Sequence, residues 1–177
     1  VAMSSTGFQH IAVIGAGAWG TALALTAARA GRRVSLWARE ADVRDTIRAQ
    51  GENVRFLPGT RLTGIDVMDE ATDAAGADAI LLAAPAQHLR ATLALIAPAL
   101  RPGRPVVLCA KGLERGTAKL MTEVLAEAAP AVAGAILSGP SFADDVARGL
   151  PTAVTLAAGD MRLAEQLSAA LGTATFR

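Results

Sequence analysis

The sequence predicts an α/β protein with a doubly wound, mostly parallel sheet that carries helices on both faces. Short apolar runs alternate along the chain with helical stretches of about ten to twelve residues, which is the pattern of repeated β-α units. The first apolar run ends in a glycine-rich turn, Gly15–Gly20. Although 52% of the 177 residues are hydrophobic, only 3% are aromatic. Aliphatic and alanine side chains of this kind let helices pack closely on a sheet.

The first β-α-β unit is the clearest. Residues 10–14 form an apolar run, and residues 21–30 are rich in helix formers. Gly31 ends that helix, and residues 33–37 predict a second strand, which closes a unit of about 30 residues. This spacing predicts a Rossmann-type domain over residues 8–177, because no internal repeat or linker divides the chain. Val1-Ala2 precedes Met3 as a vector-derived extension does, so we expect about the first seven residues to lie outside the fold.

The rest of the chain continues the alternation. Further strands are predicted at 65–68, 78–84, 105–110, 134–138 and 152–157, and further helices at 41–50, 87–97, 117–128, 141–148 and 161–171. Residues 53–64, which contain Pro58-Gly59, are expected to be a loop, and residues 173–176 to begin a last strand. Ser141 is expected to cap the short helix that follows it.

Ligands of such sheets bind beyond the carboxyl ends of the strands, where the strand order reverses. Within Gly15-Ala16-Gly17-Ala18-Trp19-Gly20, one glycine permits the tight turn, one lets the backbone approach a pyrophosphate, and one permits close packing of helix on strand. The helix that follows offers amide donors and the positive end of its dipole. With a strand before it and a helix after it, the turn predicts a dinucleotide site.

Arg39 follows the second strand, where a dinucleotide fingerprint expects an acid for the ribose 2′-hydroxyl. A guanidinium suits a 2′-phosphate, which favours NADPH over NADH, although the neighbouring Glu40 offsets that preference. The alternative is a solvated arginine at a strand end.

Other polar residues follow later strand ends. Lys111 either projects into the crevice or is an ordinary surface lysine, and Gly139-Pro140-Ser141 is either a tight turn with a capping serine or a small-anion site. His10 is interpreted as structural because it begins a strand. His88 lies near the crevice without a partner spaced for acid-base or metal chemistry.

Composition narrows the function. The net charge of +1 gives no basic footprint for nucleic acid, and no apolar run is long enough for membrane insertion. Cys109 is the only cysteine and is interpreted as inert core, which favours a cytoplasmic protein and excludes a cysteine-rich metal cluster. We expect no metal site. Without hydrolase or kinase motifs, an oxidoreductase is the remaining enzyme class.

Four segments together resemble one family, the bacterial NAD(P)-dependent glycerol-3-phosphate dehydrogenases. They are residues 15–24, 53–59 (Asn-Val-Arg-Phe-Leu-Pro-Gly), 110–114 (Ala-Lys-Gly-Leu-Glu) and 137–143 (Leu-Ser-Gly-Pro-Ser-Phe-Ala). The resemblance implies reversible reduction of dihydroxyacetone phosphate to glycerol 3-phosphate for phospholipid synthesis. By the same resemblance, Ala18, Trp19, Arg39 and Ala143 match positions that contact the cofactor, Lys111 one that contacts cofactor and substrate, and Gly139 and Ser141 positions that contact the substrate.

The resemblance also implies something outside this sequence. In the family, a lysine acting as general acid and base belongs to a following helical substrate domain, and we expect that lysine and that domain to lie beyond Arg177. No catalytic residue is therefore predicted within the chain, and the chain alone is expected to be inactive. Two other hypotheses stay open: a reductase of another small carbonyl compound, and a non-catalytic nucleotide-sensing module. The oligomeric state is also open, a homodimer of the full-length protein being one alternative.

Overall fold

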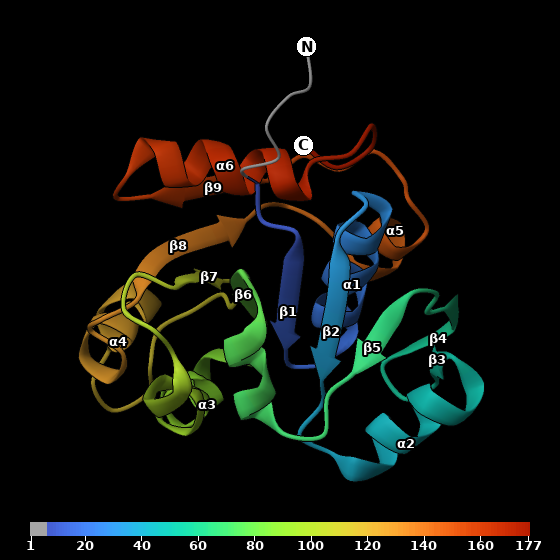
Figure 1. Cartoon of the computed structure of the whole chain (residues 1–177), viewed down its shortest axis with the longest axis horizontal. Coiled ribbons are helices and arrows are strands. Elements are labelled where there is room, and N and C mark those ends of the chain that lie inside the picture. The colour runs from blue at the N-terminus through green and yellow to red at the C-terminus, as the bar shows by residue number, and fades with distance from the viewer. Residues whose placement is uncertain (1–6) are drawn as a thin grey trace.

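The computed structural model describes residues 7–177, and its centre is a seven-stranded sheet with helices on both faces (Figure 1). The strand order is β5-β2-β1-β6-β7-β8-β9, and every neighbouring pair is parallel except the antiparallel pair of β8 and β9. The prediction of a doubly wound, mostly parallel sheet is confirmed. The expectation for the first seven residues concerns positions that, apart from Gly7, lie outside the described residues.

The strands of the main sheet are β1 (His10–Ile14), β2 (Arg33–Trp37), β5 (Ile65–Val67), β6 (Ala79–Leu82), β7 (Pro105–Leu108), β8 (Ala133–Ser138) and β9 (Thr155–Ala158). The α-helices are α1 (Ala18–Arg29), α2 (Ala41–Gln50), α3 (Leu89–Ile96), α4 (Met121–Ala128), α5 (Ala143–Ala147) and α6 (Met161–Leu171). Short 3₁₀ helices cover η1 (Ala71–Gly76), η2 (Ala86–His88) and η3 (Ala97–Ala99).

Two apolar layers hold the helices to the sheet. The side chains of β1 and β6 alternate between them, so that Val13 and Leu81 lie in one layer and Ile14 and Leu82 in the other. α1, α5 and α6 contribute to the first layer, and α3 and α4 to the second, on the opposite side of the sheet (Figure 1). Because both faces are covered, the central strands are wholly apolar, as continuous apolar runs predict.

The strand order reverses between β1 and β6. β2 and β5 extend the sheet on one side of β1, and β6 to β9 extend it on the other. The connections that leave the carboxyl ends of β1 and β6 therefore diverge and leave a crevice between them. The glycine turn follows β1 directly and so lies at this crevice.

Two glycines of the turn are required by packing. Gly15 has a φ of +105°, and a Cβ there would lie 2.9 Å from the carbonyl carbon of Ala83. A Cβ on Gly20 would lie 1.8 Å from the carbonyl oxygen of Gly15. Gly17 has ordinary backbone angles and no atom of the chain within 4 Å of a built Cβ. Packing thus explains Gly15 and Gly20 but not Gly17.

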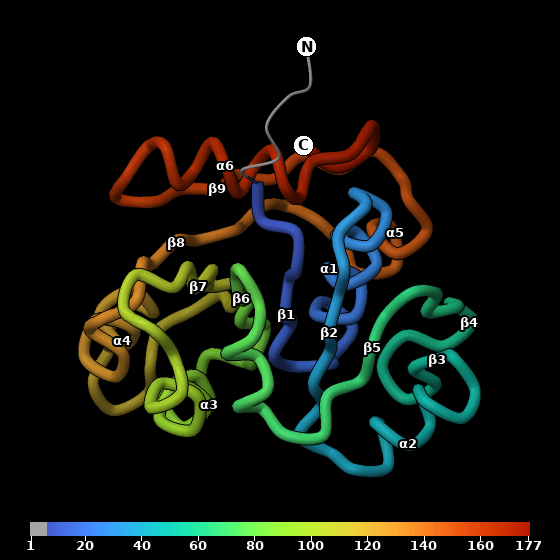
Figure 2. Tube along the Cα trace, in the orientation of Figure 1, coloured from blue at the N-terminus to red at the C-terminus, as the bar shows by residue number. Residues whose placement is uncertain are grey.

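The expected loop over residues 53–64 is wrong in part, because a two-stranded hairpin stands there. β3 (Glu52–Asn53) pairs antiparallel with β4 (Leu57–Arg61), and the hairpin lies beside α2, outside the main sheet (Figure 2). The sequence pattern indicates this hairpin only weakly, because β3 has only two residues and the pairing register shifts within it. Pro58 is tolerated because the hairpin consists of two edge strands.

Several predicted boundaries also move. α1 begins three residues earlier than expected, at Ala18, and α4 begins only at Met121. The stretch before α4 folds as a loop in which Gly116 and Ala118 have positive φ, which breaks the helix. Residues 173–176 form no strand, since only a single parallel bridge joins Thr152 to Phe176. A helix able to cross a lipid bilayer is not found in residues 7–177.

The close approach at the glycine turn predicts a stability difference between two alanine substitutions. Gly20→Ala should lower the free energy of unfolding by about 3 kcal/mol, because the new methyl group displaces the Gly15 carbonyl. Gly17→Ala is the matched control and should change it by less than about 1 kcal/mol. Urea denaturation measures both. Equal stability of the two variants would show that the turn relaxes around the methyl group.

Candidate functional site

The glycine turn presents the N-terminus of α1 to the crevice. Gly17 is the N-cap residue, no side chain caps the helix, and its first turn contains no acidic residue. The first amides of an α-helix have no carbonyl partner within the helix, so they remain donors for an external acceptor. An anion placed there is stabilised by these donors and by the helix dipole.

A cavity of about 550 Å³ extends from the turn across the carboxyl ends of β1, β2 and β6. It contains the turn's Gly15 and Gly17 together with Arg39 and Glu40, so the structure brings these predicted residues to one place. Apolar side chains of the hairpin and of α3 complete its wall. The full lining is Ile14, Gly15, Ala16, Gly17, Trp37, Arg39, Glu40, Phe56, Ala83, Ala84, Pro85, His88, Ala91, Thr92 and Leu95.

Arg39 lines this cavity from the segment directly after β2. Its guanidinium donates a hydrogen bond of 3.1 Å to Glu40, and its side chain is 66% exposed. An exposed ion pair of this kind contributes little to stability, so Arg39 is available for another anion. Glu40 competes with such an anion because its carboxylate occupies one edge of the guanidinium.

A second cavity, of about 500 Å³, adjoins the first at Gly17 and Pro85. Its lining is Gly17, Ala18, Trp19, Gly20, Ala83, Ala84, Pro85, Ala86, Cys109, Ala110, Lys111, Ser141, Phe142 and Ala143. The Lys111 ammonium donates a hydrogen bond of 2.7 Å to the Gly139 carbonyl, which connects the segment after β7 with the segment after β8. The remaining predicted residues are therefore gathered at this end of the crevice.

Ser141 does not cap α5, contrary to expectation. The helix begins at Ala143 with Phe142 as its N-cap residue, and no side chain accepts from its first turn. The Ser141 hydroxyl is instead buried without a hydrogen-bond partner.

Among the described residues two further buried side-chain atoms lack partners, and one is the indole nitrogen of Trp37. Buried polar atoms in this state are rare, and here two of them belong to residues that line the crevice. Such groups suit an external polar ligand.

The loop that carries Lys111 is held by a polar cluster. Arg90 of α3 donates two hydrogen bonds to Glu114, of 2.7 and 2.9 Å, and one of 2.8 Å to Glu127 of α4. Thr117 adds a bond of 2.6 Å to Glu114. These donors to the carboxylate, the Arg90 guanidinium foremost, lower the pKa of Glu114 from 4.5 to about 2. Glu114 therefore stays ionised and paired at neutral pH.

Two further hydrogen bonds join the same loop to η2. The side chain of Gln87 donates to the Leu113 carbonyl at 2.8 Å and accepts from the Arg115 amide at 2.9 Å. Because Pro85 and Ala86, just before Gln87, also line the second cavity, one short segment forms a wall of the crevice and holds the Lys111 loop.

The histidines and the cysteine lie where the sequence places them. His10, at the amino end of β1, contacts the Ser35 hydroxyl at 2.6 Å, far from the crevice edge of the strand. His88 lines the first cavity. Cys109 is buried, and burial raises the pKa of its thiol to about 12, so the thiol stays protonated. Within residues 7–177, His, Cys, Asp and Glu side chains do not gather in groups of three or more able to hold a metal ion.

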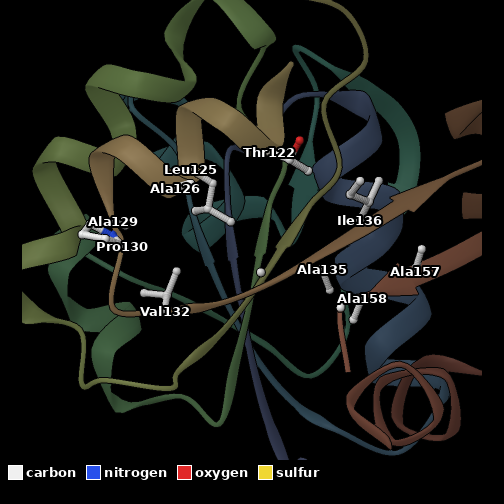
Figure 3. Close-up of a pocket in the computed structure, with 12 residues that line it drawn as sticks. Thr122, Leu125, Ala126, Ala129, Pro130, Val132, Ala135, Ile136, Ala157 and Ala158 are labelled. Carbon is white, nitrogen blue, oxygen red and sulfur yellow. The ribbon is translucent and has the colours of Figure 1, made fainter. Parts of the chain in front are cut away.

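Another hollow lies on the sheet away from the crevice. Figure 3 shows it between α4 and the strands β8 and β9, with the side chains of Leu125, Val132 and Ile136 around it. Its volume is about 510 Å³, and Thr122 supplies the only hydroxyl group among the side chains that line it. None of the predicted site residues lies there, so it adds nothing to the candidate site.

Most of the chain matches a known protein family. The family model described as NAD-dependent glycerol-3-phosphate dehydrogenase N-terminus matches residues 10–164. The chain belongs to this family. The glycine turn, Lys111 and Ser141 all fall within the matched range.

The relatives that this chain matches are longer than the segment that aligns with it. A glycerol-3-phosphate dehydrogenase [NAD(P)+] of Bradyrhizobium sp. (strain ORS 278) is 63% identical over 171 residues, which cover 96% of this chain and 52% of that protein. The protein of the same name from Bradyrhizobium sp. (strain BTAi1) is 62% identical, with 97% and 53% covered. The crystal structure of the Coxiella burnetii glycerol-3-phosphate dehydrogenase superposes with a TM-score of 0.89 at 35% identity, covering 96% of this chain and 53% of that one. The chain thus spans about half the length of the relatives it matches.

Sequence reasoning missed three residues of the site. Phe56 lines the first cavity from the hairpin turn, and Gln87 and Glu114 hold the Lys111 loop. Phe56 and Glu114 were inside segments that resemble the glycerol-3-phosphate dehydrogenase family, which is the signal that could have found them. Gln87 carried no signal, because its partners lie 26 and 28 residues further along the chain.

The lowered pKa of Glu114 predicts a pH effect on stability. A carboxyl group with a depressed pKa in the folded state stabilises that state above its unfolded pKa and loses this contribution as the pH falls through the folded pKa. The wild-type chain should lose more unfolding free energy between pH 4.5 and about 2 than Glu114→Gln does. Denaturant titrations at several pH values measure this. Glu165→Gln, on the exposed side of α6, is the control and should follow the wild type. If Glu114→Gln also followed the wild type, the ion pair would contribute nothing to folding.

Proposed function

We propose that residues 8–177 are the dinucleotide-binding domain of an NAD(P)-dependent glycerol-3-phosphate dehydrogenase. The reaction is dihydroxyacetone phosphate plus NAD(P)H and a proton giving sn-glycerol 3-phosphate and NAD(P)⁺, reversibly, as a step toward phospholipids. One observation carries the proposal: an uncapped helix N-terminus at a glycine turn lies between a cavity that contains Arg39 and a cavity that contains Lys111 and Ser141. This arrangement of first cavity, helix N-terminus and second cavity matches a dinucleotide that lies along the crevice with the substrate at one end.

The residues of the glycine turn and of the first cavity are assigned to the cofactor. Gly15, Gly17 and Gly20 form the turn that receives the pyrophosphate, and Ala18 and Trp19 continue the contact along the first turn of α1. The apolar wall, with Phe56 and Leu95, suits an adenine ring. Arg39 is assigned to the ribose 2′-phosphate, which favours NADPH over NADH, while its ion pair with Glu40 weakens that preference.

The residues of the second cavity are assigned to the nicotinamide end and the substrate. The nicotinamide supplies or accepts the hydride at the central carbon of the substrate. Ala143 lies on the cofactor side, and Lys111 contacts both cofactor and substrate. Gly139 and the unpartnered hydroxyl of Ser141 are assigned to the substrate. The ammonium of Lys111 stabilises negative charge on the substrate, and the Gly139 carbonyl keeps it in place.

We assign the proton transfer to a lysine outside this sequence. The sequence contains only two lysines, Lys111 and Lys119. Lys119 pairs with Glu127 and does not line the crevice. Lys111 already donates to Gly139 and is assigned to charge stabilisation. Neither lysine of this sequence is therefore assigned to the proton transfer. We place the protein in the cytoplasm, where the Cys109 thiol stays reduced.

Spectroscopic assay of NADPH oxidation tests the proposal. A chain of the relatives' full length should reduce dihydroxyacetone phosphate, whereas residues 1–177 alone should bind NADPH without turnover. A preference for a ketone without phosphate would favour a different reductase. Dinucleotide binding without activity toward any carbonyl compound, even at full length, would favour a nucleotide-sensing module.

Arg39→Ala should weaken NADPH binding by about tenfold or more and leave NADH binding nearly unchanged, because only NADPH carries the 2′-phosphate. Isothermal titration of residues 1–177 measures both dissociation constants. Arg33→Ala, at the opposite end of the same strand, is the matched control and should affect neither. An equal loss for the two cofactors would remove the 2′-phosphate role from Arg39.

Lys111→Met at full length should lower kcat for dihydroxyacetone phosphate reduction by roughly 100-fold while NADPH still binds, because the charge that faces the substrate is lost. Lys119→Met is the control, since it removes the other lysine without touching the crevice. Steady-state kinetics with a separate NADPH titration distinguish the two effects. Wild-type kinetics in Lys111→Met would make Lys111 an ordinary surface lysine.

A further inference from the structure

Asn53 is one of the few polar side chains that the fold buries completely, and it lies beside the glycine turn. Its exposed fraction is 1%. The side-chain amide donates to the Ala16 carbonyl at 2.8 Å and to the Thr21 hydroxyl at 2.9 Å, and its oxygen accepts from the Phe56 amide at 3.2 Å. Reversing the amide would set its oxygen against the Ala16 carbonyl oxygen, so the partners determine its orientation.

The bonds to Ala16 and Thr21 join the hairpin to a part of the chain that lies 37 and 32 residues earlier. Ala16 belongs to the glycine turn, Thr21 to α1, and Phe56 to the hairpin that borders the first cavity. Thr21 is wholly buried, and its hydroxyl also faces the Ala16 carbonyl, at 3.4 Å. The carbonyl of Ala16 is therefore directed at the hairpin by the shorter bond from Asn53.

The direction of that carbonyl determines the direction of the next amide. In a planar trans peptide the C=O and N–H bonds point in opposite directions, and no cis bond occurs in the described chain. Holding the Ala16 oxygen toward the hairpin thus turns the Gly17 N–H away from the hairpin. Gly17 lines both cavities of the crevice.

We propose that Asn53 is a positioning residue for pyrophosphate binding, which it serves by holding the Ala16–Gly17 peptide so that the Gly17 amide faces the crevice. The inference rests on the proposed function, because it needs a dinucleotide in that crevice. Asn53 itself touches no ligand. Its effect is confined to ligands that carry a pyrophosphate.

The test compares two ligands on residues 1–177: ADP, which has a pyrophosphate, and adenosine 2′-phosphate, which has none. Asn53→Leu keeps a similar volume and removes the side-chain bond from position 53 to the Ala16 carbonyl. It should weaken ADP binding by about tenfold or more and change adenosine 2′-phosphate binding by less than about threefold. Thr21→Val is the matched control in the same buried cluster. It removes one Asn53 partner and the longer bond of the Thr21 hydroxyl to Ala16 but keeps the Asn53 bond to Ala16. It should therefore lower thermal stability without changing the ratio of the two affinities.

The outcomes separate the two proposals. If the wild-type chain binds neither ADP nor NADPH, the proposed function fails. If it binds both and a folded Asn53→Leu binds ADP equally well, or loses both ligands in equal measure, the positioning role is overturned while the proposed function stands. If Asn53→Leu does not fold, amide resonances of the wild-type chain decide. The amide resonance of Gly17 should shift when ADP is added and should not move when adenosine 2′-phosphate is added. The reverse pattern, or no shift with either ligand, overturns the inference.

Discussion

The close approach of α1 to the sheet at Gly15 and Gly20 is the contact on which the rest of the molecule depends. A methyl group at Gly20 would overlap the Gly15 carbonyl, and one at Gly15 would press on the backbone after β6. Only with both glycines in place can α1 start directly at the end of β1 and point its first amides across the switch point. The same contact brings the ends of β1 and β6 close enough for the segments that follow them to line a common crevice.

The segments after the strands are positioned by polar side chains rather than by the sheet. Arg90 and Gln87 hold the loop that carries Lys111, and Asn53 holds the glycine turn against the hairpin. Arg29, at the end of α1, donates to the Val146 carbonyl at 2.8 Å and so holds α5, which follows Ser141. Each of these bonds joins residues that are distant along the chain. The crevice is thus a set of loops whose geometry depends on a few well-satisfied polar contacts around an apolar core.

The parts of the fold that the sequence predicts are those with a strong local signal. β1, β2, α2 and α6 have the predicted bounds because their apolar periodicity and flanking glycines act within the element itself. The hairpin of β3 and β4 and the late start of α4 were not predicted. Their causes are an irregular two-residue pairing in one case and positive φ at Gly116 and Ala118 in the other. The capping role expected of Ser141 is wrong because α5 begins at Ala143, after Phe142 as its N-cap residue, and the Ser141 hydroxyl has no hydrogen-bond partner.

The class of the fold, the glycine turn and the residues that follow each strand can be predicted from the sequence, since each of these depends on residues that are neighbours along the chain. Its segments also carry the resemblance to glycerol-3-phosphate dehydrogenases that the family match confirms. Which of those residues contact one another depends on the folded arrangement of the strands and helices. The pairing of Lys111 with Gly139, the hydroxyl of Ser141 without a partner, and the burial of Asn53 beneath the turn all depend on contacts across 28 or more residues or on the packing of separate elements. Pattern along a chain reports local preference, whereas these contacts arise when the sheet closes and brings the strand ends to one edge.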